Sequence, residues 1–471
     1  MQKDQRESVS KNSVFIILSP SGEEIVIDEK FLANKSFSGD KALNCLLNNE
    51  FKGLSGKEVP SIKAMQKLEL VGYEPVSDNG HFRFYPKGFL VYELIKAWAD
   101  EIAEDLNCFK IKTPILYNWE HPAIRAQGES FHERHYLASG SEKDKEFVMR
   151  FAGDFGLFSM LSDVQMSYRQ LPLRIYEFSD SFRYEQHGEL SGLKRLRAFS
   201  MPDIHSFCED IDQGMEEYKN LFKNYANLVL ASGIEYGVVF RVVADFYEKN
   251  KQEICELLSY CGKSAMIEIL PERKHYWAMK HEFCSIDAVG GVCQLSTVQL
   301  DIEDAERYGI KYRSRNNEEK GCIICHSSIG SIERWMFSIL EDSLKKEKPC
   351  LPIWLSPVQI RLIPVSDQHA EKAEAFYSAL VKNKIRVDID DSENSISWKI
   401  RQAEKNWIPF TIIVGDRDNL DSEFSVRLRS GKIESFDLAG FLEKISAETK
   451  GFPFSRLSYK YASSYPVFHG K

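Results

Sequence analysis

Apolar and polar residues alternate in short runs along much of the chain, and this pattern predicts strands. The first run, SVFIILSPSGEEIVI at residues 13–27, has a turn-type SPSG between two apolar halves, so we expect a hairpin. Residues 92–107 carry apolar side chains near helical spacing and predict an amphipathic helix. The helix is followed by FKIKTPILYN, a strand pattern that Pro114 interrupts.

Residues 147–344 contain mostly short β-type runs, including RIYEFSDSFRYE, LRAFSMPDIHSFC, CQLSTVQLDI and CIICHSS. Turns, and only a few helical segments, separate these runs. This arrangement indicates a largely antiparallel sheet and argues against a Rossmann fold.

A boundary is expected between Lys346 and Trp354, where KKEKPCLPIW combines a charge run with two prolines. Strand and helix patterns alternate beyond it and predict a small α/β domain with a mixed sheet. We therefore expect an α+β protein of three parts: a small N-terminal module of unknown role over residues 1–65, a central domain over 66–350 and a last domain over 351–471.

Composition narrows the class of protein. Hydrophobic residues make up 43% and charged residues 28% of the 471 residues, which fits a globular protein. The net charge of -9 neither predicts nor excludes RNA binding, because phosphate contacts need only local basic clusters. The start of the chain resembles no signal peptide and no apolar run could cross a membrane, so we expect a cytoplasmic protein. The ten cysteines, including the CxxC pair Cys322 and Cys325, predict buried thiols without disulfides.

Arginines flank the polar, glycine-containing loop that joins RIYEFSDSFRYE to LRAFSMPDIHSFC. A guanidinium group is always charged and binds oxyanions through two parallel hydrogen bonds, which suits a polyphosphate. Arginines on a solvated strand face would explain the same pattern about equally well.

Three motifs in order favour the first interpretation. FRYE, its loop and RAF resemble motif 2 of the class II aminoacyl-tRNA synthetases. The helix and strand that end at Pro114 resemble motif 1, a dimer element, and GSIER at residues 330–334 resembles motif 3. Within this class the chain resembles the threonyl family over residues 66–445, through SYRQLPLRIYEFSDSFRYEQHGELSGLKRLRAF, TVQLD and WLSPVQ.

The resemblance implies an antiparallel class II catalytic domain, a C-terminal anticodon-binding domain and a homodimer. It implies as substrates ATP with Mg²⁺, L-threonine and tRNA(Thr). Arg183 would hold the α-phosphate and the amino-acid carboxylate, and Arg195 and Arg334 would hold the outer phosphates. The other implied ATP-binding residues are Glu185 at the adenine amino group, Phe199 stacked on the ring, and Gln294.

The resemblance also implies one Zn²⁺ in the threonine pocket, held by His205 and His326. Asp154 stands where bacterial members have a cysteine, and a carboxylate oxygen can replace it in a site with open positions for substrate. Asp203 would accept the substrate hydroxyl, and Tyr276, Gln299 and Ser331 would line the pocket. A site built around the hydroxyl rejects valine by roughly 10⁴ to 10⁵.

Serine is harder to reject, because it lacks only a methyl group worth about 1–3 kcal/mol. The region before Gln66 is shorter than the editing region of many family members. We therefore expect no editing in cis and a separate deacylase that acts in trans. His132 is the nearest candidate for the base of acyl transfer, which remains unassigned.

In the last domain, three residues match family positions that contact anticodon bases: Arg401, Asp418 and Arg427. Two alternatives stay open at this stage. The chain could be a paralogue that binds tRNA without aminoacylating it, or a synthetase for serine or proline. The arginine cluster favours an enzyme, since a binding module needs no polyphosphate clamp.

Overall fold

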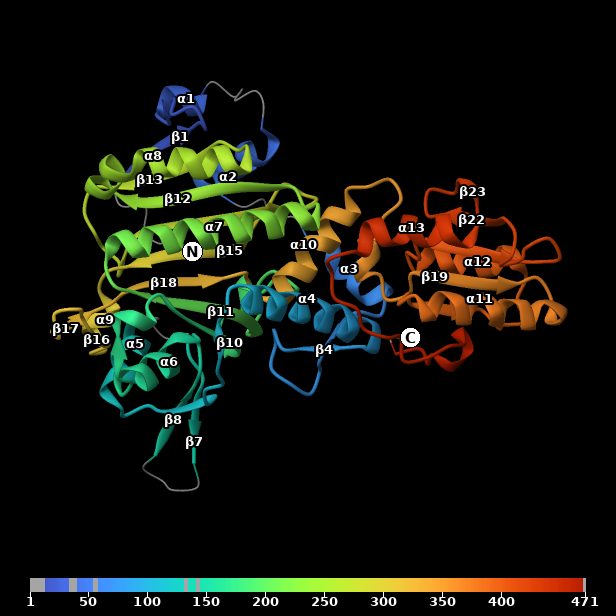
Figure 1. Cartoon of the computed structure of the whole chain (residues 1–471), viewed down its shortest axis with the longest axis horizontal. Coiled ribbons are helices and arrows are strands. Elements are labelled where there is room, and N and C mark those ends of the chain that lie inside the picture. The colour runs from blue at the N-terminus through green and yellow to red at the C-terminus, as the bar shows by residue number, and fades with distance from the viewer. Residues whose placement is uncertain (1–12, 34–39, 54–57, 131–133, 141–144, 469–471) are drawn as a thin grey trace. The chain divides into compact units, whose positions relative to one another are not determined.

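A computed structural model describes the chain in five segments: residues 13–33, 40–53, 58–130, 134–140 and 145–468. The chain divides into two compact units, the first containing residues 1–58 and 100–338 and the second containing residues 59–99 and 339–471. Figure 1 labels the helices and strands of both units.

A ten-stranded sheet forms the centre of the first unit within the described residues, in the order β2-β1-β13-β12-β14-β15-β18-β11-β10-β5. Its strands are β1 (Val14–Leu18), β2 (Glu24–Val26), β5 (Phe109–Lys110), β10 (Leu173–Phe182), β11 (Ala198–Cys208), β12 (Tyr236–Val243), β13 (Ala265–Leu270), β14 (Trp277–Ile286), β15 (Val292–Asp301) and β18 (Ile323–Ser328). Apart from β12 with β13 and β10 with β5, neighbouring strands run antiparallel. The expected antiparallel sheet is confirmed.

The long helix α7 (Ile211–Ser232) packs across β11, β15 and β18 (Figure 1). Asp210 caps its start by accepting a hydrogen bond from the Gln213 amide, and Gly233 ends it in the left-handed conformation with φ 70°. Its buried face carries large side chains such as Tyr218, Phe222 and Tyr225. The other helices of this unit are α1 (Glu29–Ala33), α2 (Lys41–Lys52), α5 (Pro122–Ser130), α6 (Asp154–Ser162), α8 (Ala244–Cys261) and α9 (Asp304–Arg307).

The N-terminal hairpin is confirmed, and it belongs to the large sheet. β1 pairs with β2 on one side and with β13 on the other. Phe15 and Ile17 of β1 and Leu43 of α2 form one buried cluster with Val239 and Met266 of the sheet. The hairpin and α2 are therefore part of the first unit, because these apolar side chains are buried together with those of the large sheet.

Smaller strands surround the large sheet. β6 (Leu116–Asn118), β7 (Leu137–Ser139) and β8 (Glu146–Met149) form one three-stranded sheet, and β9 (Met166–Ser167), β16 (Lys311–Arg313) and β17 (Glu319–Gly321) form another. All ten cysteines are free, and Cys322 and Cys325 are buried as expected. Among the residues that the structure describes, no helix has the length and apolar character that a membrane crossing requires.

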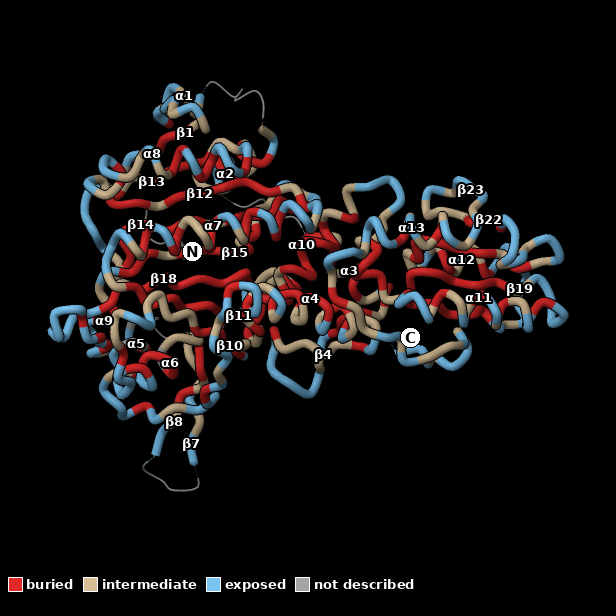
Figure 2. Tube along the Cα trace, viewed as in Figure 1, coloured by how far each residue is buried: buried red, intermediate tan, exposed pale blue. Residues whose placement is uncertain are grey.

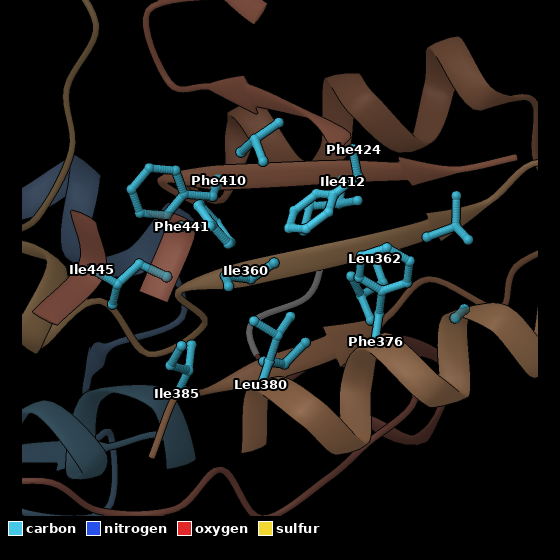
Figure 3. Close-up of a cluster of buried hydrophobic side chains, with 14 of the residues drawn as sticks. Ile360, Leu362, Phe376, Leu380, Ile385, Phe410, Ile412, Phe424, Phe441 and Ile445 are labelled. Atoms are coloured by element: carbon cyan, nitrogen blue, oxygen red, sulfur yellow. The ribbon is translucent and has the colours of Figure 1, made fainter. Parts of the chain in front are cut away.

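A five-stranded mixed sheet forms the core of the second unit, in the order β20-β19-β21-β22-β23. Its strands are β19 (Ile360–Pro364), β20 (Val387–Ile389), β21 (Phe410–Val414), β22 (Phe424–Leu428) and β23 (Ile433–Phe436), and its helices are α11 (Ala370–Lys382), α12 (Ile396–Lys405) and α13 (Leu438–Thr449). β20 and β21 run parallel to β19, whereas β22 and β23 continue antiparallel, so the predicted mixed α/β domain is confirmed. Figure 3 shows Leu362, Phe376 and Phe424 among the apolar side chains between this sheet and its helices.

The second unit also contains α3 (Ser61–Lys67), β3 (Val71–Tyr73) and β4 (Phe82–Phe84). α4 (Pro86–Asp105) and α10 (Ile332–Leu344) contribute residues to both units. The helix expected over residues 92–107 is confirmed as α4, which begins six residues earlier at Pro86. Figure 2 shows that buried residues are concentrated in the strands of both sheets.

Candidate active site

The centre of the large sheet aligns predicted pocket residues on adjacent strands. His205 on β11 is the register partner of His326 on β18, and His326 is the partner of Gln299 on β15. Register partners point to the same face of a sheet, so these three side chains form a row. Asp203 precedes His205 by two positions and points to the same face. Strand pairing thus gathers residues that are far apart in the sequence.

The two histidines of this row lie in contact. Their ring centroids are 5.0 Å apart, and Phe158 lies beside both rings. Burial, together with the charge of His326, lowers the pKa of His205 well below its ordinary value, so His205 is neutral at pH 7. Burial also lowers the pKa of His326, but the hydrogen bond and charge of Asp301 outweigh this effect and raise it. A neutral imidazole is the form that binds a metal.

Among the described residues, one set of three acidic and imidazole side chains has all its potential ligand atoms within 4.8 Å of one another: Asp301, Asp304 and His326. His326 Nε2 lies 2.6 Å from Asp301 Oδ2. Two ligands on one tetrahedral zinc, each bonded at about 2.0–2.2 Å, would be roughly 3.4 Å apart. The short contact is therefore a hydrogen bond from the ring to a carboxylate, of the kind that orients metal-binding histidines.

Asp154, the predicted third ligand, lies at the start of α6 and does not belong to this set. Its charge raises the pKa of His326, and its Oδ1 is buried without a hydrogen-bond partner in the structure. A buried carboxylate oxygen without a donor is a costly arrangement that a cation would relieve. The donor set of Asp154, His205 and His326 therefore fits a zinc ion, although the structure brings only the two histidines into direct contact.

Arg183, Glu185 and Arg195, three of the residues predicted to bind ATP, lie in the loop between β10 and β11, and Arg334 contacts this loop. Arg183 lies over the ring of Phe199, with its guanidinium carbon 5.2 Å from the ring centroid, and its Nε donates to the Phe151 carbonyl at 3.0 Å. Burial, followed by the nearby charge of Arg334, lowers the pKa of Arg183. Arg334, at the start of α10, donates to the carbonyl oxygens of Lys194 (3.3 Å) and Gln294 (3.4 Å).

Glu185 and Arg195, which were predicted at opposite ends of ATP, form an ion pair at 2.9 Å. Arg134 also pairs with Glu185 at 3.3 Å, and both arginines contact Glu189 at 3.4–3.5 Å. Arg134 and Glu189 were not predicted from the sequence; Arg134 is 51 residues from Glu185 and meets it only in the folded chain. His132 of that segment is outside the described residues.

Two of the predicted threonine-binding residues, Tyr276 and Gln299, contact each other beside His326. The Tyr276 hydroxyl donates to Gln299 Oε1 at 2.8 Å, and its ring lies 5.3 Å from that of His326, centroid to centroid. Asp203 accepts a hydrogen bond from the Ser179 hydroxyl at 3.2 Å, and burial raises its pKa to about 6. Ser331 accepts a hydrogen bond from the backbone amide of Arg334 at 3.2 Å and so caps the first turn of α10.

The predicted anticodon residues all lie on the five-stranded domain. Arg427 on β22 donates to Glu404 on α12 at 3.2 Å, and Arg401 lies on the same helix one turn before Glu404. Asp418 accepts hydrogen bonds from the amides of Gly415 and Ser425 at 3.0 and 3.4 Å. Asp418 therefore shapes the β21–β22 loop, whereas the exposed Arg401 remains available to a partner.

Two family models match the chain. The model of the class II tRNA synthetase core domain (G, H, P, S and T) matches residues 136–343, and that of the anticodon-binding domain matches residues 359–448. Solved structures with similar folds include a threonyl-tRNA synthetase RNA-binding domain and a prolyl-tRNA synthetase, both from Cryptosporidium parvum. The first has a TM-score of 0.71 at 23% identity and covers 84% of this chain and 99% of that chain. The second has a TM-score of 0.67 at 15% identity and covers 86% and 78%.

Full-length relatives match more closely in sequence. The threonine–tRNA ligases of Pyrococcus horikoshii and Thermococcus kodakarensis are each 40% identical, over 96% of this chain and 73% of theirs. The ligase of Methanocaldococcus jannaschii is 36% identical, over 99% of this chain and 78% of its own length. With the three class motifs placed around one sheet and an anticodon-binding domain attached, the chain belongs to the threonine–tRNA ligase family of class II tRNA synthetases.

Proposed function

We propose that this chain activates L-threonine with ATP and transfers it to tRNA(Thr). The observation that carries the proposal is the closeness of the two predicted sites. Arg183 of the ATP site is subject to the charges of Arg334, Asp154 and Asp203, two of which belong to the predicted threonine pocket. A carboxylate bound by Arg183 would thus have its amino group and hydroxyl on the wall that carries Asp203 and the two histidines.

In the first step a carboxylate oxygen of threonine attacks the α-phosphorus of ATP. The bond from that phosphorus to the bridging oxygen breaks, and pyrophosphate leaves with its Mg²⁺. Arg183 would hold both the carboxylate and the α-phosphate, and Arg334 would hold the outer phosphates. Fixed cations offset the repulsion between these anions in a site that water does not screen, which lowers the barrier.

Asp154, His205 and His326 are the residues that would hold the zinc ion. A bound Zn²⁺ supplies coordination positions for the amino group and the β-hydroxyl of threonine, and valine has no hydroxyl to offer. Asp203 would accept a hydrogen bond from the substrate hydroxyl when its carboxyl group is ionised, and Tyr276 and Gln299 would line the pocket. Selection of threonine then depends on polar groups that would be left unpaired around valine.

In the second step a ribose hydroxyl at the 3′ end of tRNA attacks the adenylate carbonyl, and AMP leaves. The base that takes the hydroxyl proton is not assigned. Arg401, Asp418 and Arg427 are the proposed contacts of the second unit to the anticodon. Bases that are splayed out from a single-stranded loop can be recognised on their edges by such side chains. ATP and tRNA are cytoplasmic substrates, and we place the reaction there.

The active form is proposed to be a homodimer. Three apolar side chains are exposed around Pro114, where the segment that resembles motif 1 ends: Phe109 at 66%, Ile115 at 39% and Leu116 at 51%. Exposed apolar clusters of this kind favour a protein partner. Sedimentation of the purified chain tests the dimer, and a monomer at micromolar concentration would contradict it.

ATP–pyrophosphate exchange tests the activity. The purified chain should catalyse exchange with threonine, a weaker exchange with serine, and none with proline or valine. Exchange with proline would redirect the proposal to another amino acid. An absence of exchange, together with intact tRNA binding in a gel-shift assay, would identify a tRNA-binding paralogue.

A further inference from the structure

A buried ion pair joins two loops beside the predicted ATP site. Lys194 lies in the β10–β11 loop, and its Nζ donates to Asp287 Oδ2 at 2.9 Å. Asp287 lies in the turn between β14 and β15. The exposed fractions of the two side chains are 17% and 1%, so water screens this pair far less than a surface pair.

Backbone hydrogen bonds of the turn orient the carboxylate of Asp287 independently of Lys194. Its Oδ1 accepts the backbone amides of Val289 and Gly291 at 3.1 and 2.6 Å, and its own amide donates to the Gly291 carbonyl at 2.8 Å. A Cβ atom on Gly291 would lie 2.4 Å from Asp287 Oδ2 and 3.0 Å from Lys194 Nζ. The turn therefore requires glycine at this position to leave room for the pair.

Arg334 contacts the β10–β11 loop and strand β15. Its Nε donates to the main-chain carbonyl of Lys194, and its Nη1 donates to that of Gln294, which β15 holds by pairing with Cys284 of β14. Lys194 therefore provides both the ammonium group of the ion pair and one of the two carbonyls that Arg334 contacts. If the pair is broken, the loop loses a contact to the β14–β15 turn, and the Lys194 carbonyl is held less firmly relative to that of Gln294.

We propose that the ion pair of Lys194 and Asp287, called the Lys194–Asp287 latch below, positions Arg334 for the outer phosphates of ATP. The inference rests on the proposed function and extends it to residues that do not touch the substrate. Preorganised charge stabilises a transition state because it does not have to be reoriented during the reaction. Without the latch, Arg334 must be ordered by ATP itself, and this cost appears when ATP binds.

Steady-state ATP–pyrophosphate exchange with the full chain tests the latch. The variants are D287N, which keeps the shape of the turn and removes the charge, and K194M, which removes the ammonium group. Each should lower kcat/KM for ATP by roughly 10- to 100-fold, while KM for threonine changes by less than about twofold. The double variant K194M/D287N should be no worse than the poorer single variant, because both remove one interaction.

E268Q is the matched control. Glu268 on β13 is buried and forms an ion pair with the part-buried Arg241 on β12, and neither residue belongs to the three motifs. It should leave KM for ATP unchanged, and thermal unfolding of each variant shows whether it has folded. If D287N unfolds, G291A provides the second test, since it crowds the pair without removing a charge.

Three results would overturn the latch. The first is an unchanged KM for ATP in both D287N and K194M. The second is an equal rise in KM for ATP and threonine, which would indicate general damage to the fold. The third is a much larger effect of K194M than of D287N, which would mean that Lys194 binds ATP directly. Failure of the wild-type chain to catalyse exchange would instead overturn the proposed function.

Discussion

Replacement of Glu177 by alanine should destabilise the first unit strongly. Glu177 on β10 is 4% exposed, and its Oε1 accepts hydrogen bonds from Arg150 Nη1 at 2.8 Å and from the Thr113 amide at 2.7 Å. Arg150 is 3% exposed. The substitution leaves a buried guanidinium without its counter-ion and a backbone amide without an acceptor.

The expected loss is about 3–5 kcal/mol in the free energy of unfolding, the typical cost of removing one partner of a buried ion pair. Part of the Arg150 side chain keeps a partner, since its Nε donates to the Asp180 carbonyl at 2.9 Å. The expected loss in the free energy of unfolding is therefore nearer to about 3 than to about 5 kcal/mol. A surface pair, by contrast, is worth about 0–1 kcal/mol.

Urea unfolding followed by circular dichroism measures the loss as a shift of the midpoint at constant slope. The control is the double variant R150M/E177L, which replaces the pair by apolar side chains and should recover most of the stability. A loss below about 1 kcal/mol in E177A would refute the assignment of a buried, water-excluded pair.

Three further predictions concern the site. Burial raises the pKa of Glu333 to about 8, so the folded state keeps a proton that the unfolded state releases above the ordinary glutamate pKa. The free energy of unfolding should therefore fall between about pH 5 and pH 8. Unfolding measured over a pH series should show a shallower fall in E333Q. Metal analysis should find zinc in the wild-type chain and none in D154A; unchanged zinc content in D154A would remove Asp154 from the ligand set. D301N should weaken zinc affinity by roughly 10- to 100-fold, because it removes the hydrogen bond between the Asp301 carboxylate and His326. Serine lacks only one methyl group of threonine, so ATP–pyrophosphate exchange should also proceed with serine, at a kcat/KM roughly 10- to 200-fold below that for threonine; discrimination above about 10⁴ would contradict this expectation.

The sequence alone determined the chemistry that the chain carries and much of its local structure. Turn residues between apolar runs specified the hairpin at residues 13–27, and helical spacing specified the helix that contains Trp98. The order of the three motifs indicated the class II synthetases, and segments such as TVQLD and WLSPVQ indicated the threonyl family, because each is a run of neighbouring residues that is recognisable before any contact is known.

Only the tertiary structure decided which distant residues meet. Alternation shows which side chains of a strand share a face, but it does not show which strand lies beside it or in what register. The row of His205, His326 and Gln299 and the pair of Lys194 with Asp287 therefore had to come from strand pairing and loop packing. The same holds for β1. Its apolar residues predicted a strand with a buried face, but only the pairing with β13 showed that it joins the catalytic sheet.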